Sequence, residues 1–180
     1  DAMSVSGVAR DLAARLGVPF RIPEWSVESV SGSAEDVATF NIEDPVLCPR
    51  FTGRVIKNVS VGSSPLWMQM RLLLSGMRPI NSVVDVSNYV MLELGTPNHT
   101  YDLALVPNSH IGVRGASDGE QITTLDNQER TLVAGDGVIV DESDQAIGIA
   151  GVMGGASTEI SSSTTGVLLE LASWHPESIA

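Results

Sequence analysis

Apolar and polar positions in the first third of the chain predict one helix followed by two strands. From Ser4 to Leu16 the apolar residues recur every three or four positions, which indicates a helix that Gly17 can close. Residues 18–36 are weakly patterned and contain prolines and serines, so we expect a linker with at most one short strand. Residues 37–42 and 51–61 are each typical of a strand.

A second helix is predicted where serines precede a proline. Ser63 or Ser64 suits the N-cap, and Pro65 suits the first helical turn. The helix is expected to continue to about Ser75, where Gly76 stops it. Four of its apolar residues are expected to be buried: Leu66, Met70, Leu73 and Leu74.

The segment from Arg78 to Asp102 combines dense apolar residues with polar ones. Asn81, or the serine after it, suits a helix N-cap, and Gly95 suits the left-handed position after a helix end. The apolar residues are too dense for a surface helix with one wet face, yet four polar residues interrupt them: Asp85, Ser87, Asn88 and Glu93. Because buried polar groups need partners, these residues are either structural hydrogen bonders or the lining of a pocket. Pro97 prevents the helix from resuming, so His99 is expected on a proline-braced turn.

The rest of the chain changes to short strands separated by turns. Runs bounded by Gly, Asp, Asn or Ser predict strands at residues 110–114, 121–125, 130–133, 137–140 and 146–152, with hairpin turns at 126–128 and 142–144. Residues 156–165 predict a small polar loop. Residues 166–173 are almost continuously apolar, which predicts a strand in the centre of a sheet. The expected helices lie in the first part of the chain and most of the expected strands in the later part, which predicts an α+β fold.

Length and composition suit one domain, or one domain with a small appendage. The chain has 180 residues, and 43% of them are hydrophobic, which is ample for a core. No apolar run approaches the roughly 18 residues of a membrane span, and no signal peptide is evident, so a cytoplasmic location is expected. Cys48 is the only cysteine, so an internal disulfide is excluded and a small core residue is expected.

The net charge of −12 argues against a nucleic-acid-binding surface over the whole chain, since phosphate contacts rely on Lys and Arg. Half of the ten basic residues are nevertheless close together in sequence: Arg50, Arg54, Lys57, Arg71 and Arg78. They either form a local patch or are scattered charges paired with nearby acids. If RNA is a substrate, this chain is expected to contact only its end.

Four blocks of sequence form longer motifs. Residues 83–90 read Val-Val-Asp-Val-Ser-Asn-Tyr-Val, and residues 95–102 read Gly-Thr-Pro-Asn-His-Thr-Tyr-Asp. Residues 48–51 read Cys-Pro-Arg-Phe, and Gly-Val-Met-Gly-Gly at 151–155 leads into Val-Leu-Leu-Glu at 167–170. In this order the blocks resemble the editing domain of the bacterial phenylalanyl-tRNA synthetase beta subunit, in which a glutamine is usual at the position of the threonine after the glycine of the second block.

The resemblance extends from about Asp1 to Ile179 and implies a layered α+β domain, with a β-sandwich-like core flanked by helices. It implies that residues 1–45 form an N-terminal helix and linker and that residues 46–180 form the editing core. Family members continue past Ala180 into a segment that completes the pocket. The chain is therefore expected to be an excised fragment, truncated at its C-terminal end.

His99 is the strongest catalytic candidate among the three histidines. An imidazole can accept, donate or shuttle a proton near neutral pH, although a buried histidine is more often structural. The resemblance implies that His99 lines the editing pocket, where it positions water or contacts the ribose. His110 and His175 match no position of the motif.

Glu170 is the candidate for substrate selectivity. It lies in an apolar segment, where an ionised carboxylate needs a partner, and on a strand it shares a face with Leu168 and Ala172. Its side chain either reaches solvent from an edge strand or points into a cavity to accept a hydrogen bond from a ligand. The resemblance implies the second, with Glu170 recognising the phenolic hydroxyl of tyrosine.

Four more residues match pocket positions of the family: Gly154, Arg78, Ser87 and Asn88. Each also has a structural interpretation, since paired glycines mark bulges, a cation favours a helix end, and Ser and Asn bond to helix backbone. The resemblance implies that Gly154 lets a ligand approach the backbone. It also implies that Arg78 borders the site, near the terminal ribose or phosphate.

The resemblance implies hydrolysis of the ester of mischarged tyrosyl-tRNA(Phe), while the whole synthetase attaches phenylalanine to tRNA(Phe) with ATP. A site that activates phenylalanine discriminates only about a hundredfold against a substrate that adds a hydroxyl. A second site that requires the hydroxyl can therefore remove the mischarged tyrosine. No metal or cofactor is expected in this segment, and ATP and Mg²⁺ are expected in other domains. The expected partners are the tRNA(Phe) acceptor end and the synthetase alpha subunit in an α2β2 heterotetramer, with no membrane or DNA. The alternative is a non-catalytic module that docks domains or offers a nucleic-acid or protein surface.

Overall fold

The computed structural model describes residues 2–22, 24–27 and 32–179. The chain divides into two compact units. The helical unit comprises residues 1–32 and 63–98, and the sheet unit comprises residues 33–62 and 99–180. This division differs from the predicted boundary after residue 45, because the chain leaves the sheets, forms two helices and then returns to the sheets.

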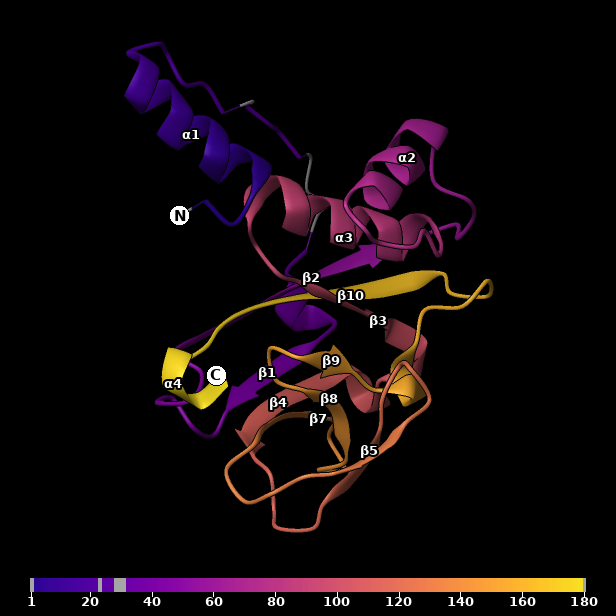
Figure 1. Ribbon diagram of the computed structural model, residues 1–180. Helices are drawn as coiled ribbons and strands as arrows, with labels where there is room; N and C mark the ends of the chain where they lie inside the picture. The colour runs from indigo at the N-terminus through magenta and orange to yellow at the C-terminus, as the bar shows by residue number, and fades with distance from the viewer. Residues whose placement is uncertain (1, 23, 28–31, 180) are drawn as a thin grey trace. The chain divides into compact units, whose positions relative to one another are not determined.

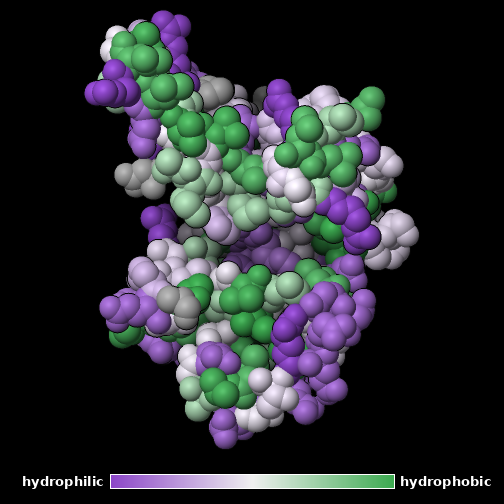
Figure 2. All heavy atoms as spheres, in the orientation of Figure 1, coloured by the Kyte–Doolittle hydropathy of each residue, from purple (hydrophilic) through white to green (hydrophobic). Residues whose placement is uncertain are grey.

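The helical unit contains α1 (Val5–Leu16), α2 (Leu66–Leu74) and α3 (Ser82–Leu94) (Figure 1). α1 begins and ends as predicted: Ser4 Oγ accepts a hydrogen bond from the Gly7 N–H, and Gly17 adopts a φ of 65°. Apolar side chains are visible on both α1 and α2 (Figure 2). Those exposed on α1 are Val5, Val8, Leu12 and Leu16.

α2 buries a different face from the predicted one. Its buried residues are Met68 and Leu72, which lie one turn apart. The four residues expected in the core are exposed by 47% to 83%: Leu66, Met70, Leu73 and Leu74. Because α2 is apolar on nearly all sides, its sequence period does not single out the buried face. The predicted serine cap is also wrong, since Pro65 holds the N-cap position without a side-chain hydrogen bond.

α3 has its predicted caps. Asn81 Oδ1 accepts from two backbone N–H groups in the first turn, and Gly95 adopts a φ of 74°. Asp85 is the only fully buried residue of α3, so the helix is less enclosed than its apolar density indicated. The Asp85 carboxylate accepts hydrogen bonds from the Ser64 hydroxyl and from the Ile80 N–H. Of the two alternatives, Asp85 is therefore a structural hydrogen bonder.

Five strands of the sheet unit form one sheet. Their order is β1 (Thr39–Ile42), β4 (His110–Gly115), β7 (Gly137–Val140), β8 (Ala146–Ile149) and β9 (Met153–Gly154). β1 runs parallel to β4, and the other neighbours are antiparallel. β5 (Gln121–Thr123) and β6 (Glu129–Thr131) form a separate hairpin. Both predicted hairpins are confirmed.

Short helices precede, connect or follow the strands of the sheet unit. They are η1 (Ala34–Asp36), η2 (Leu103–Leu105), η3 (Pro107–Ser109), η4 (Ala156–Thr158) and α4 (Pro176–Ile179). Within the described residues, no helix is long and apolar enough to cross a membrane.

β10 (Gly166–Ser173) is the central strand of a three-stranded sheet, as its apolar run predicted. It pairs antiparallel with β2 (Arg50–Lys57) on one side and β3 (His99–Asp102) on the other. β2 is shorter than predicted because Asn58 adopts a φ of 58°, which ends extended geometry. β3 replaces the predicted proline-braced turn: His99 is the first residue of a strand, because the backbone there pairs with β10.

The two larger sheets share a hydrophobic core. Its buried residues come from both sheets and from the connections beside their strands: Ala38, Leu47, Cys48, Tyr101, Val106, Ile111, Val113, Ile139, Ile147, Ala150 and Leu168. Cys48 is 0% exposed, which confirms its expected role as a small core residue. Open sheets combined with helices confirm the predicted α+β class.

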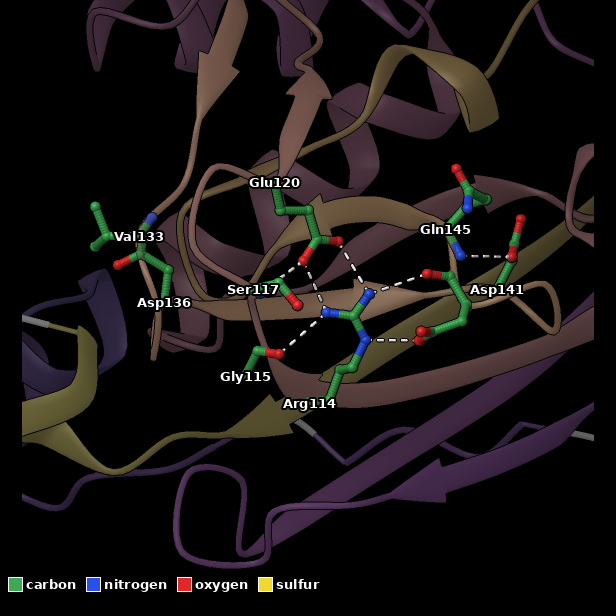
Figure 3. Close-up of polar contacts among 9 residues, drawn as sticks. Arg114, Gly115, Ser117, Glu120, Val133, Asp136, Asp141 and Gln145 are labelled. Carbon is green, nitrogen blue, oxygen red and sulfur yellow. Dashed lines mark hydrogen bonds and ion pairs between the residues drawn. The ribbon is translucent and has the colours of Figure 1, made fainter.

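Arg114 of β4 fastens two turns of the sheet unit. Its guanidinium donates to both carboxylate oxygens of Glu120 at 2.9 Å and to Asp144 Oδ1 at 2.6 Å (Figure 3). The side chains of Arg114 and Glu120 are only 14% and 16% exposed. The hydrogen bonds from Arg114 hold the pKa of Glu120 below its usual value. The network therefore ties the turn before β5 and the β7–β8 turn to β4.

Candidate functional site

Three polar side chains lie on one face of the three-stranded sheet. In the register of β3 and β10, Glu170 is paired with His99, and Leu168 is paired with Tyr101. Paired residues of antiparallel strands point to the same face, and so do residues two positions apart on one strand. Tyr101 and Leu168 belong to the shared core, so His99 and Glu170 are directed to that face as well. The edge-strand interpretation of Glu170 was wrong, because β10 is central.

The phenol of Tyr101 donates a hydrogen bond to Glu170 Oε2 at 2.6 Å. Tyr101 is 1% exposed and Glu170 is 7% exposed. Burial raises the pKa of Glu170 to about 7, while the hydrogen bond from Tyr101 opposes that rise. Burial and the neighbouring carboxylate raise the pKa of Tyr101 well above its usual value, so the phenol keeps its proton and donates.

The imidazole of His99 lies against the backbone of Gly154. A Cβ atom at residue 154 would lie 2.2 Å from His99 Cε1 and 2.3 Å from Nε2, so a larger residue would displace the ring. The ring also meets Tyr101 edge-on, with 4.5 Å between centroids. Burial lowers the pKa of His99 to about 4, so the imidazole is neutral at pH 7 and can accept a proton.

Two glycines of the five-stranded sheet lie next to the rings of His99 and Tyr101. Gly148 is paired with Gly154 in the register of β8 and β9. A Cβ atom at Gly148 would lie 3.6 Å from the Tyr101 hydroxyl oxygen, which is ordinary contact. The two paired glycines therefore give His99 and Tyr101 room on this face of the sheet.

An aromatic ring encloses the other flank of Glu170. Gly53 of β2 is paired with Glu170, and a Cβ atom at Gly53 would lie 2.2 Å from Phe40 Cζ. The ring of Phe40 thus covers the strand beside the carboxylate. Burial of the Glu170 side chain on this face of the sheet is the physical cause of its raised pKa.

Three of the six predicted site residues, His99, Gly154 and Glu170, lie together in the sheet unit. The other three, Arg78, Ser87 and Asn88, belong to the helical unit. Arg78 is exposed in the segment between α2 and α3, and Asn88 is half-buried on α3.

Ser87 fastens the segment that follows α3. Its hydroxyl donates to the Asn98 carbonyl, and the Asn98 side chain donates to the Ser87 carbonyl, each at 3.2 Å. The hydroxyl thus bonds outside α3, whereas the structural interpretation expected a bond to the helix backbone. Neither bond tests a role of Ser87 in substrate binding.

The five basic residues are divided between the two units. Arg50, Arg54 and Lys57 lie on β2, whereas Arg71 and Arg78 belong to the helical unit. Arg71 packs over the Trp67 ring and donates to the Tyr89 hydroxyl, so it has partners within its own unit.

Tyr101 is the residue of this site that sequence reasoning missed. In the sequence it stands out only as part of the second motif block. The available signal was its spacing, because in a strand a residue two positions after His99 must share its face.

Metal-ligand clusters and pockets are two further kinds of candidate site. Among the described residues, no group of three or more His, Cys, Asp or Glu side chains is placed to hold a metal ion. A groove in the helical unit is lined by α1, the end of α3, residues 20–22 and Trp25. None of the six predicted site residues lines this groove.

The family model described as the B3/4 domain matches residues 47–180. Because the match covers most of the chain, the chain belongs to the B3/4 domain family. The relatives it matches are named phenylalanine–tRNA ligase beta subunit. That of Geobacter sulfurreducens is 49% identical and that of Staphylococcus saprophyticus is 44% identical, each over 179 residues. Each alignment covers 99% of this chain, which spans 22% of the length of these curated relatives.

A solved structure has the same fold. It is an N-terminal fragment of the phenylalanyl-tRNA synthetase beta subunit from Pyrococcus horikoshii, with a TM-score of 0.55 and 14% sequence identity. The likeness covers 98% of this chain and 53% of that one. At this identity it shows the fold, in agreement with the predicted α+β architecture.

Proposed function

We propose that the chain is an editing domain that hydrolyses the ester of tyrosine mischarged onto tRNA(Phe). The proposal joins three supports: the B3/4 family, relatives named phenylalanine–tRNA ligase beta subunit, and the group of His99, Tyr101 and Glu170. Glu170 would select the substrate, and His99 would act at the ester.

The observation that carries the proposal is the contact between Glu170 and a phenol. Tyr101 presents to Oε2, at 2.6 Å, the same chemical group that distinguishes tyrosine from phenylalanine. The carboxylate of Glu170 therefore already accepts a hydrogen bond from a phenol in this environment. Glu170 Oε1 accepts no hydrogen bond from any residue that the structure describes. That oxygen is the proposed acceptor for the substrate.

The expected selectivity follows from the unpaired acceptor. A phenylalanyl ester would desolvate Oε1 without replacing the lost hydrogen bond, at a cost of roughly 1–3 kcal/mol. A tyrosyl ester would satisfy the oxygen. This difference corresponds to a preference for tyrosine of about 5- to 150-fold.

The proposed chemistry is attack of water on the ester carbonyl carbon, with departure of the ribose oxygen. The imidazole of His99 is neutral because its pKa is lowered to about 4, so it can orient that water through a ring nitrogen but is a weak acceptor of its proton. It can equally hold the ribose hydroxyl. Gly154 would keep His99 in place and leave the neighbouring backbone open to the ligand.

We propose further that the chain acts within a larger enzyme in the cytoplasm. That enzyme would use ATP and Mg²⁺ in other domains and would attach phenylalanine to tRNA(Phe). The alpha subunit would be its partner in an α2β2 heterotetramer. This chain would receive only the acceptor end of the tRNA, in keeping with its net charge of −12.

A deacylation assay of the full-length assembled protein tests the proposal. Tyrosyl-tRNA(Phe) is supplied to the wild type and to the Glu170→Ala and His99→Ala variants. We expect release of tyrosine by the wild type and at least a tenfold lower rate in both variants. Binding of the tRNA without release of tyrosine by the wild type would instead support the non-catalytic docking module.

A further inference from the structure

We propose that Tyr101 is a positioning residue for tyrosine selectivity: its phenol occupies Glu170 Oε2, which leaves Oε1 as the acceptor for the phenol of the substrate. The inference rests on the proposed function of Glu170 and names the residue that orients it. A single carboxylate would thus accept two phenols, one from the protein and one from the ligand.

The fold holds the phenol of Tyr101 in place. Tyr101 is paired with Leu168, so its side chain lies diagonally next to Glu170 on the same face. The ring is 1% exposed and packs edge-on against His99 at 4.5 Å between centroids. The donor therefore has little freedom to move.

The carboxylate, in contrast, depends on this donor for its orientation. A glutamate side chain has three rotatable bonds, and the phenol of Tyr101 is the hydrogen-bond donor to Glu170 among the described residues. An ionised carboxylate offers about four acceptor positions on two oxygens. With Oε2 engaged at 2.6 Å, the carboxylate is anchored at one oxygen, and Oε1 keeps its lone pairs for a ligand.

The same hydrogen bond favours the ionised form that the acceptor role requires. It opposes burial, which raises the pKa of Glu170 to about 7. The other titratable groups facing Glu170 do not supply a positive charge: His99 on β3 is neutral at pH 7, and Cys48 before β2 has its pKa raised by burial. β2 contributes Gly53 at the paired position. Tyr101 is thus the group that holds the carboxylate in its accepting form.

The Tyr101→Phe variant of the full-length assembled protein tests the inference. Deacylation of tyrosyl-tRNA(Phe) and phenylalanyl-tRNA(Phe) is followed from pH 6 to pH 9. We expect the preference for the tyrosyl ester at pH 7 to fall about tenfold, the effect of one lost hydrogen bond. We also expect the inflection of the tyrosyl rate near pH 7 to move to higher pH. A merely structural role would not move that inflection.

The Thr164→Val variant is a matched control. Thr164 donates to Asp102 on the same strand, in a buried bond that is also 2.6 Å long, and it has no contact with Glu170. We expect this variant to keep both the wild-type selectivity and the wild-type pH profile. If Tyr101→Phe behaves in the same way, Tyr101 does not position Glu170.

Incorporation of trifluorotyrosine at residue 101 covers the case in which the phenylalanine variant does not fold. The analogue is nearly isosteric and is a stronger donor, so the inflection should move to lower pH. An unchanged inflection overturns the inference. If Glu170→Ala itself leaves the wild-type selectivity intact, the proposed function fails. If Glu170→Ala abolishes selectivity but both changes at residue 101 do not alter it, only the role of Tyr101 fails.

Discussion

The imidazole of His99 and the backbone of Gly154 are in such close contact that no β-carbon fits between them. A Cβ atom at residue 154 would lie 2.2 Å from His99 Cε1. The two residues come from different sheets, β3 and β9, so this contact joins the two sheets at the candidate site. The position of the His99 ring thus depends on the absence of a side chain at residue 154.

Replacing Gly154 by alanine should therefore displace His99 without unfolding the sheet unit. We expect the rate of tyrosine release to fall at least tenfold and the imidazole nitrogen shifts of His99 to change. Gly115→Ala, on β4, is the control, because its Cβ atom would be in ordinary contact with Gly135 at 3.8 Å. Wild-type rates and shifts in Gly154→Ala would show that the contact is unimportant.

The stability of the chain should depend on pH through Glu170. Its pKa is about 7 in the folded state and about 4.5 in the unfolded chain, so the folded state binds the proton more tightly. The contribution of this group to stability is complete below pH 4.5 and is lost as the pH rises to 7. Glu170→Gln cannot titrate, so its stability relative to the wild type should increase across this range, by at most about 3 kcal/mol. Urea unfolding at pH 4.5, 6 and 7.5 measures the difference, and a constant difference contradicts the assignment.

Glu120 should give the opposite pH dependence. Its pKa is lowered by the hydrogen bonds from Arg114, so its contribution is present above pH 4.5 and is lost as the pH falls through its folded-state value. Glu120→Gln should reduce the free energy of unfolding by about 1–2 kcal/mol at pH 7 and by less at pH 3. The exposed Glu129 of β6 provides the control variant, Glu129→Gln, which should unfold like the wild type. Equal losses at both pH values would exclude an ionic contribution.

Asp85 should be essential for the helical unit. Asp85→Ala leaves the Ser64 hydroxyl and the Ile80 N–H without their acceptor, which should cost about 2–4 kcal/mol in the free energy of unfolding. Val86→Ala, at the next position and 47% exposed, should cost much less. Thermal unfolding followed by circular dichroism compares the two variants. Similar losses would mean that the buried carboxylate is not a specific clamp.

Local signals in the sequence were sufficient where one residue decides the geometry. The ends of α3 were predicted because Asn81 can cap the first turn and Gly95 can adopt a left-handed backbone. The central position of residues 166–173 followed from a run that is apolar on both faces. Neither inference required knowledge of distant contacts.

Long-range contacts explain what could not be predicted. The strand of four residues from His99 to Asp102 carries mostly polar side chains, and it exists because β10 supplies its hydrogen bonds. The buried face of α2 depends on the partners of Met68 and Leu72, which its own apolar pattern does not identify. The hydrogen bond of Tyr101 likewise depends on Glu170, which lies 69 residues away in sequence.

The site was predictable only in part, for the same reason. Motif resemblance selected His99, Gly154 and Glu170, which the sheet unit brings together. It also selected Arg78, Ser87 and Asn88, whose role in substrate binding remains a prediction. Ser87 forms its hydrogen bonds with Asn98, which belongs to the same helical unit.

The ratio of the hydrolysis rates of tyrosyl-tRNA(Phe) and phenylalanyl-tRNA(Phe) tests the central claim most directly. It is measured for the full-length assembled wild type and for Glu170→Ala at pH 8, where the carboxylate of the wild type is ionised. We predict a ratio in the wild type of at least about tenfold in favour of tyrosine, and a ratio near one in the variant, which has no acceptor for the phenol. An unchanged ratio in Glu170→Ala would show that this carboxylate does not recognise the phenol of the substrate.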